Sequence, residues 1–305
     1  MRKLLFSFSI LFLVLVFGHI SQAAPRGVFD FQSCVFEVRP SIENQLTMVP
    51  VAKIEDNRVE VHYINVGQAD AIYISLPNKN DILIDAGSEA DSKKVVNYLT
   101  SRSVDDIELM IATHNHEDHI GGLPGVLEAF KVEKIIDSGV GANTKIYNDF
   151  FSKARTKSVR WETDNRQTIT VGNNELQILT GPENWQDTND NSVICRLDTG
   201  DVEFLFMGDA EGPVESSLSG QIEAEILKIG HHGSQTSTSI ALLNKVHPKV
   251  AIISVGVGNK YKHPAPETIQ RLTSANVTIY RTDSNGNILV TTDGKTYHVY
   301  PERCG

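Results

Sequence analysis

The chain has 305 residues, of which 40% are hydrophobic and 22% charged, and its formal net charge is −10. This balance is typical of a globular protein with a sizeable core. We do not expect tight, non-specific DNA binding, because it needs a basic surface and the sequence holds no cluster of five or more Lys and Arg residues.

Residues 1–23 have the pattern of a secretory signal peptide, since two basic residues precede the apolar run Leu4–Phe17 and small residues end at Ala23. The alternative is a membrane anchor, but about 20 apolar residues are needed to span a bilayer and this run is shorter. Cleavage after Ala23 removes two positive charges, so the net charge of −10 becomes −12. We therefore predict a secreted or periplasmic protein without stable membrane anchoring, whose mature chain begins with a leader over 24–57.

From residue 58 to residue 305, runs rich in β-branched and aromatic residues alternate with amphipathic runs, which predicts one α/β domain. The strands expected in its first half are Val59–Val66, Ala71–Leu76, Ile82–Asp85, Ile107–Thr113 and Lys134–Asp137. The expected helices are Ser92–Arg102, Leu123–Phe130 and Ile146–Lys157.

The second half begins with strands again and then alternates helices with strands. The expected strands are Thr168–Val171, Glu175–Leu179, Val193–Leu197, Val202–Met207 and Ile226–Ile229. Asn285-Gly286 is a hairpin signal and is expected to link the last β runs. Each half thus offers a sheet followed by helices, and two such halves packed sheet to sheet would give a four-layer αββα sandwich.

Four side chains with metal-binding chemistry follow the expected strand Ile107–Thr113. They are His114, His116, Asp118 and His119. Imidazole and carboxylate groups are ligands for zinc and similar divalent ions. In an extended loop the first two would point to one side and the last two to another, so the run can serve two adjacent ions. This pattern indicates a metal-dependent hydrolase.

The run Thr113–His119, THNHEDH, resembles the signature of the metallo-β-lactamase superfamily. Further motifs resemble the hydrolase domain of ComEC-type competence proteins, and their order holds from about residue 59 to residue 300. They are Val66–Ala71, Asn189–Ser192, Gly208–Asp209, His231–Ser234, Ser254–Gly256 and His263–Pro264. The resemblance implies a metallo-β-lactamase sandwich that stands alone, without the membrane channel of those proteins.

The resemblance also implies roles for particular residues. Asp85 would orient the metal loop without binding metal, and Asp209 would bridge the two ions. One residue of the pair His231 and His232 would bind the second ion, and the sequence leaves open which one. Neighbouring residues that leave a strand point in opposite directions, so the other is expected to be a hydrogen-bond partner or a proton donor.

Asn189 stands where many enzymes of the superfamily have a histidine ligand, a replacement that the ComEC-type proteins share. An amide oxygen suits Mn²⁺ as well as Zn²⁺, so two divalent ions of either kind are the expected cofactors. Asn65 and Ala69 depart from the DVGQGDA pattern of those proteins, where Asp and Gly are expected. A changed substrate is one reason for such a departure.

Two ions would lower the pKa of a bridging water, so the attacking group is expected to be a hydroxide made at the metal and oriented by Asp118. His231, His232 or His263 would protonate the leaving oxygen. His263 lies in a loop with Lys260 and Lys262, whose charges favour a phosphate group.

Exported phosphodiesterase or nuclease activity on a small or oligomeric phosphodiester is the function that the resemblance favours. Hydrolysis of another ester, a thioester or a β-lactam is the first alternative, because the superfamily hosts those reactions as well. A non-catalytic metal-binding scaffold is the second alternative, and its mark would be lost ligands. The sequence predicts no oligomeric state.

The three cysteines divide by position. Cys34 and Cys304 lie near the two ends of the mature chain and are the pair that a disulfide would join in an oxidising compartment. Cys195 lies in an apolar run and is expected to be buried.

Overall fold

The computed structural model describes residues 58–77, 79–181 and 184–304. They all belong to one compact unit, Phe31–Gly305. The predicted signal peptide (1–23), the predicted leader (24–57) and Cys34 lie outside the described residues, so those predictions stay predictions. No described helix is both long and apolar enough to cross a bilayer.

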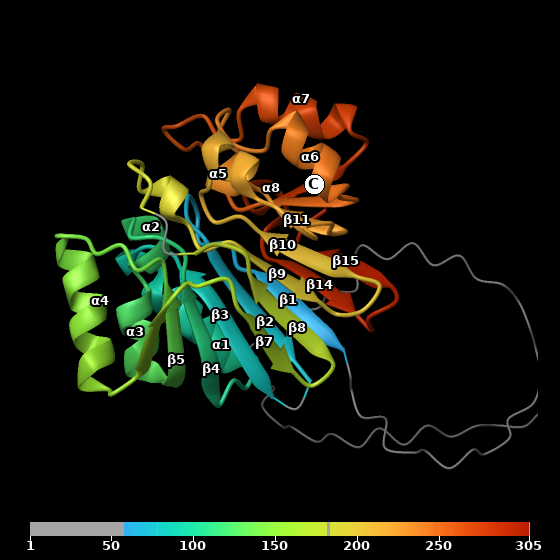
Figure 1. Ribbon diagram of the computed structural model, residues 1–305. Coiled ribbons are helices and arrows are strands. Elements are labelled where there is room, and N and C mark those ends of the chain that lie inside the picture. Colours follow the sequence, from blue (N-terminus) through green and yellow to red (C-terminus); the bar gives the residue numbers. More distant parts are fainter. Residues whose placement is uncertain (1–57, 78, 182–183, 305) are drawn as a thin grey trace, which may run out of the picture. The chain divides into compact units, whose positions relative to one another are not determined.

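The described strands form two mixed sheets, in the orders β15-β14-β1-β2-β3-β4-β5-β6 and β13-β12-β11-β10-β9-β8-β7 (Figure 1). The first sheet contains β1 (Val59–Tyr63), β2 (Ala71–Leu76), β3 (Asn80–Ala86), β4 (Asp106–Ala112), β5 (Lys131–Asp137), β6 (Arg160–Thr163), β14 (Ile288–Thr292) and β15 (Tyr297–Pro301). The second contains β7 (Thr168–Val171), β8 (Asn174–Ile178), β9 (Cys195–Asp198), β10 (Glu203–Phe206), β11 (Ile226–Lys228), β12 (Val250–Ile253) and β13 (Thr278–Arg281).

The described helices follow the strands in both halves of the chain. They are α1 (Ser92–Ser101), α2 (Glu117–Ile120), α3 (Leu123–Ala129), α4 (Lys145–Thr156), α5 (Gly212–Ser217), α6 (Ile240–Val246), α7 (Pro266–Ser274) and α8 (Thr282–Asn285). Short 3₁₀ turns are η2 (Glu89–Asp91), η3 (Asn189–Asn191) and η4 (Gly230–Gly233). The sequence predicted most of the strands to within a few residues, but it did not predict β6 or the short helices α2 and α8.

Alternating side chains on the strands build separate cores on the two faces of each sheet. On β2, Ile72, Ile74 and Leu76 enter the core shared by both sheets, whereas Ala71 and Tyr73 face the helices. This follows from the two-residue period of a strand, and it requires both faces to be apolar when both are covered.

The helices cover the outer faces of the two sheets. Val95 of α1 and Phe150 of α4 pack in one core with Leu83 of β3, and Figure 1 shows α3 and α4 beside the strands of this sheet. Val214 of α5 shares another core with Leu227 of β11, together with residues of α6 and α7. The predicted four-layer αββα sandwich is confirmed.

Two expectations about the C-terminal strands are wrong. β14 and β15 do not stay with the second sheet, because β14 pairs with β1 of the first, with Val59 opposite Thr292. Asn285-Gly286 does not make a hairpin, since Asn285 ends α8, which leads from β13 in one sheet to β14 in the other. The β14–β15 turn is made at Asp293, whose side chain accepts hydrogen bonds from the backbone of Lys295 and Thr296.

Glu203 on β10 predicts a pH dependence of stability. Burial, and then the neighbouring Glu225, raise its pKa from 4.5 to about 7 against the opposing effect of Arg196. Between those pH values the folded protein keeps a proton that the unfolded chain has released, so the free energy of unfolding falls as the pH rises through this window.

We therefore expect Glu203→Gln to remove that fall. The variant should exceed the parent protein in stability at pH 8 by about 1 kcal/mol, well under the full value of the shift because solvent screens this partly exposed side chain. Urea unfolding at pH 5 and pH 8 measures the difference. Equal pH slopes in both proteins would contradict the expectation.

Candidate metal centre

The candidate metal ligands come from loops at the carboxyl ends of parallel strands. β3, β4 and β5 run parallel in the first sheet, and β10, β11 and β12 run parallel in the second. Asp85 lies near the end of β3 and the histidine run follows β4, whereas Asp209 follows β10 and the His231-His232 pair follows β11. Ligand sites in α/β proteins form at such strand ends.

The Asp85 carboxylate contacts the first and last residues of the histidine run. It accepts hydrogen bonds from the Thr113 amide at 2.9 Å and the Thr113 hydroxyl at 2.6 Å. Its Oδ2 also lies 2.7 Å from His119 Nδ1. Because Nδ1 is engaged in this way, Nε2 of His119 is directed to the interior of the centre.

Asp209 Oδ2 is the point on which the imidazoles converge. It lies 3.3 Å from Nε2 of His119, 3.6 Å from that of His232 and 3.9 Å from those of His114 and His231. Asp209 is almost fully buried, so these groups meet away from bulk water. A carboxylate surrounded by imidazole nitrogens is an arrangement suited to bridging two cations.

His231 and His232 both turn toward Asp209, which corrects the expectation that they point in opposite directions. Both have left-handed backbone angles, with φ of 46° and 51°, so the alternation of an extended chain does not apply. They differ in burial and partners. His232 is buried, with Nδ1 2.9 Å from the Ser254 carbonyl oxygen, whereas His231 is a quarter exposed, with Nδ1 2.7 Å from Glu211 Oε1.

The remaining members of the run join the same centre. His114 Nε2 lies 3.0 Å from His116 Nδ1 and the two rings meet edge to face, so both side chains lie on the same side of the run, as expected. Asp118 and His119 lie on the helical turn α2, and Asp118 Oδ2 is 3.4 Å from His232 Nε2. The groups that could hold an ion, with ligand atoms within 4.8 Å of one another, include His114–His119–Asp209 and Asp118–His119–His232.

The unpartnered atoms of the centre test whether these residues fit divalent ions. Among the described residues, the buried polar atoms without a hydrogen-bond partner include His119 Nε2, His232 Nε2, Asp209 Oδ1 and Asn189 Oδ1. Buried polar atoms are normally satisfied, and these atom types are metal ligands. The donor set therefore fits divalent cations.

The electrostatics agree with that fit. Burial opposes a charge on His119, but Asp209 and Asp85 raise its pKa well above the usual value. Burial also opposes a charge on Asp209, but His119 and then His232 hold its pKa well below the usual value. For His114, burial and then His119 lower the pKa. Metal ions and protons compete for the same ligand atoms, so metal binding at this centre is expected to depend on pH.

A cavity of about 600 Å³ opens over this centre. Its lining residues are Gln68, His116, Glu117, Asp118, Asn189, Asp209, His231, His232, Lys260, Tyr261 and His263. Most of the predicted site residues are among them, whereas Asp85, His114 and His119 are buried beneath. Lys262 is not a lining residue. Gln68 belongs to the Val66–Ala71 motif and Tyr261 lies between Lys260 and Lys262, but the sequence predicted no role for either residue.

A buried ion pair behind the centre was also missed. Lys228 Nζ lies 2.7 Å from Asp70 Oδ2, with both side chains almost fully buried. Asp70 Oδ1 lies 3.5 Å from His232 Nδ1, so the pair supports the ring from the side away from Asp209. Asp70 belongs to the Val66–Ala71 motif, but its partner lies within an apolar strand that gave no signal.

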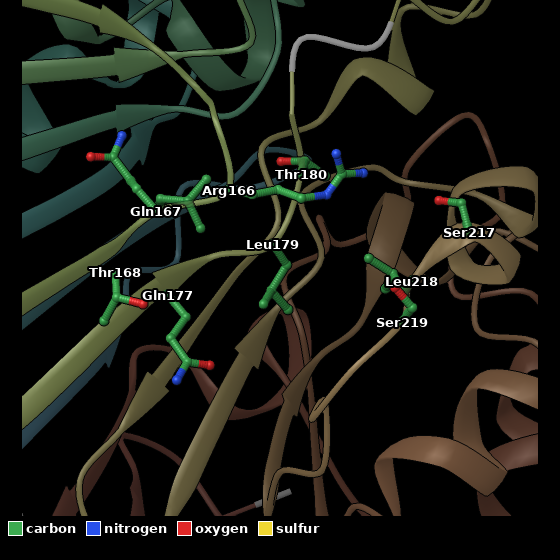
Figure 2. Close-up of a pocket in the computed structure, with 10 residues that line it drawn as sticks. Arg166, Gln167, Thr168, Gln177, Leu179, Thr180, Ser217, Leu218 and Ser219 are labelled. Atoms are coloured by element: carbon green, nitrogen blue, oxygen red, sulfur yellow. The ribbon is translucent and has the colours of Figure 1, made fainter.

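A second cavity, of about 200 Å³, shares no lining residue with the first. Figure 2 shows Thr168 and Gln177 on neighbouring strands, with Arg166 and Thr180 above them and Ser217 and Ser219 across the space. No histidine or carboxylate lines it. Of these two cavities, only the first is lined by described histidine and carboxylate side chains, which can bind metal ions.

Comparison with known proteins agrees with this geometry. The family model described as the metallo-beta-lactamase superfamily matches residues 64–257. ComE operon protein 3 of Bacillus subtilis is 29% identical over 268 residues, which cover 79% of this chain and 34% of that protein. Competence protein ComA of Neisseria gonorrhoeae is 28% identical over 239 residues, with 76% of this chain and 32% of that protein covered.

Recombination protein 2 of Haemophilus influenzae is 32% identical over 240 residues, which cover 76% of this chain and 28% of that protein. The chain thus spans about a third of the length of these curated relatives, which are competence proteins of ComEC type. With its two sheets, its converging ligands and this match, the chain belongs to the metallo-β-lactamase superfamily of metal-dependent hydrolases.

Proposed function

We propose that this chain is an exported phosphodiesterase or nuclease, secreted or periplasmic, that uses two divalent ions to cleave a small or oligomeric phosphodiester. The observation that carries the proposal is the convergence of imidazoles and carboxylates on Asp209 Oδ2. The proposed ligands form two sets that share Asp209: His114, His116 and Asn189 for one ion, and Asp118, His119 and His232 for the other. Burial and the contact with Asp118 favour His232 over His231 as the ligand.

The phosphodiester is favoured by the cavity wall as well as by the ComEC-type relatives. Lys260 and His263 line the cavity on the side of His231. A cation and an imidazole placed there match the single negative charge of a diester. The net charge of −12 expected after export opposes tight binding to long nucleic acids, so a short substrate is preferred.

When bound, two divalent ions lower the pKa of water toward neutrality and neutralise charge on the substrate oxygens. Asp118, whose side chain is one third exposed to the cavity, would accept a hydrogen bond from the attacking water and orient it. Glu211 holds Nδ1 of His231, which leaves Nε2 to donate a proton to the leaving oxygen. Lys260 would hold a phosphate oxygen during both steps.

The test compares substrates and metals on the purified protein. We expect hydrolysis of bis-p-nitrophenyl phosphate with Mn²⁺ or Zn²⁺, its loss in excess EDTA, and a decrease of about a hundredfold or more in Asp118→Ala. His298→Asn is a matched control, because His298 is exposed and does not line the cavity.

Two other functions would give different results. Turnover of nitrocefin or of a thioester without diester cleavage would overturn the phosphodiesterase proposal and favour hydrolysis of another bond. Bound metal with no turnover of any of these substrates would favour a metal-binding scaffold.

A further inference from the structure

The loop after β12 presents an exposed aromatic ring at the mouth of the metal cavity. Tyr261 is 56% exposed although it is a large apolar side chain, and it lines the cavity together with Lys260 and His263. Exposed aromatic rings beside a polar site are a common mark of ligand recognition. Neither the proposed metal ligands nor the proposed proton donor uses this ring.

One side chain closes the base of this loop. Asn259 Nδ2 donates to the carbonyl oxygens of Gly256 and His263 at 3.0 and 2.6 Å, and its Oδ1 accepts from the His263 amide at 2.9 Å. The Gly256 amide in turn donates to Gln68 Oε1 at 3.1 Å. These hydrogen bonds hold both ends of the loop that carries Tyr261.

The rings form a continuous path from the loop to the metal centre. The Tyr261 and His263 rings are stacked, with centroids 5.7 Å apart and an interplanar angle of 25°. The His263 ring lies edge-on to the His231 ring at 5.6 Å, and His231 Nε2 is 3.9 Å from Asp209 Oδ2. A group stacked on Tyr261 is therefore separated from the centre by the rings of His263 and His231, a gap that the sugar and phosphate of a nucleotide would have to bridge.

Lys260 complements the ring. Its Nζ lies 4.9 Å from the centroid of the Tyr261 ring. A cation–π contact at an exposed site is weak, so an incoming flat ring displaces the ammonium at little cost. The displaced ammonium would then be free to pair with the phosphate to which that ring is attached.

We propose that Tyr261 is the stacking platform for an unpaired nucleobase beside the scissile phosphodiester, with Lys260 on its phosphate. This inference rests on the proposed function and names its substrate class as short, single-stranded nucleic acid. Stacking of a base on an aromatic side chain tolerates any base, whereas paired bases in a duplex do not offer their faces. The platform would thus select single strands without reading their sequence.

Binding and hydrolysis test the platform separately. Fluorescein-labelled hexathymidylate is titrated with the full chain in EDTA, where cleavage stops, and binding is followed by anisotropy. We expect Tyr261→Ala to weaken binding about tenfold, Tyr261→Phe to retain it, and an unlabelled duplex to compete poorly. Val257→Ala is the matched control, because Val257 is 80% exposed on the same loop and does not line the cavity.

For hydrolysis, thymidine 5′-p-nitrophenyl phosphate is compared with methyl p-nitrophenyl phosphate, which has the same leaving group and no base. Tyr261→Ala should lower kcat/KM for the thymidine ester about tenfold more than for the methyl ester. Equal losses on both esters, or unchanged binding of the oligonucleotide, would overturn the platform. If Tyr261-dependent binding is found but neither ester is cleaved, the platform stands and the phosphodiesterase proposal fails.

Discussion

Asp209→Asn is expected to abolish metal-dependent hydrolysis, by about a thousandfold or more, while the protein still folds. The carboxylate oxygen lies no more than 3.9 Å from four imidazole nitrogens, and its other oxygen has no hydrogen-bond partner among the described residues. Asparagine keeps the shape of the side chain but removes the negative charge that both proposed ions would share.

Metal content and thermal unfolding measure this effect independently of any substrate. The parent protein should bind Mn²⁺ or Zn²⁺ and gain about 3 kcal/mol of stability at a hundredfold excess of metal over Kd, whereas the variant should show no such gain. Asp81→Asn is the matched control. Asp81, on β3, is buried like Asp209, but it lies outside the cavity and the ligand clusters. Full metal content in Asp209→Asn would contradict the proposed bridging role.

Lys228→Met is expected to destabilise the fold by about 3–5 kcal/mol, because it leaves the Asp70 carboxylate buried without its counter-ion. The two charged atoms lie 2.7 Å apart and both side chains are almost fully buried. Asp70 also contacts His232 Nδ1, so the freed carboxylate should compete for that ring and disturb metal affinity as well as stability.

Urea unfolding of the single and double variants separates the interaction energy of the Lys228–Asp70 pair from the effects of each substitution on other contacts. Lys228→Met with Asp70→Asn should recover part of the loss, since no charge is then left buried, and the double-mutant cycle gives the coupling between the two. Lys131→Met is the control for an exposed ion pair and should leave the free energy of unfolding nearly unchanged, because solvent screens such a pair. A fully stable Lys228→Met protein would show that Asp70 finds another partner.

Local patterns were sufficient to predict where the centre lies. The apolar runs before Thr113 and Asp209 are strands β4 and β10, one in each sheet. The residues that follow their carboxyl ends lie close together, with His119 Nε2 3.3 Å from Asp209 Oδ2. The carboxylate of Asp85 contacts both Thr113 and His119, which are the contacts that the orienting role implied by the resemblance requires.

Other features depend on distant contacts or on backbone angles that composition does not encode. His231 and His232 face the same carboxylate because both adopt left-handed backbone angles. Histidine has no strong preference for such angles, so the sequence does not predict them. The partner of Lys228 lies in a loop of the other sheet, so the lysine looks like an interruption in an apolar strand. The Asn285-Gly286 signal is local, whereas the pairing of β14 with β1 is not.

That pairing has a consequence for the order of events during synthesis. β1 needs β14, which is synthesised long after it, to cover its second edge. Until β14 pairs with it, β1 has one edge without a partner strand, and such an edge can pair with other chains. Because the two strands are far apart in the sequence, their pairing is also expected to be slow. Chains truncated before Ile288 should therefore aggregate, however complete their metal ligands are.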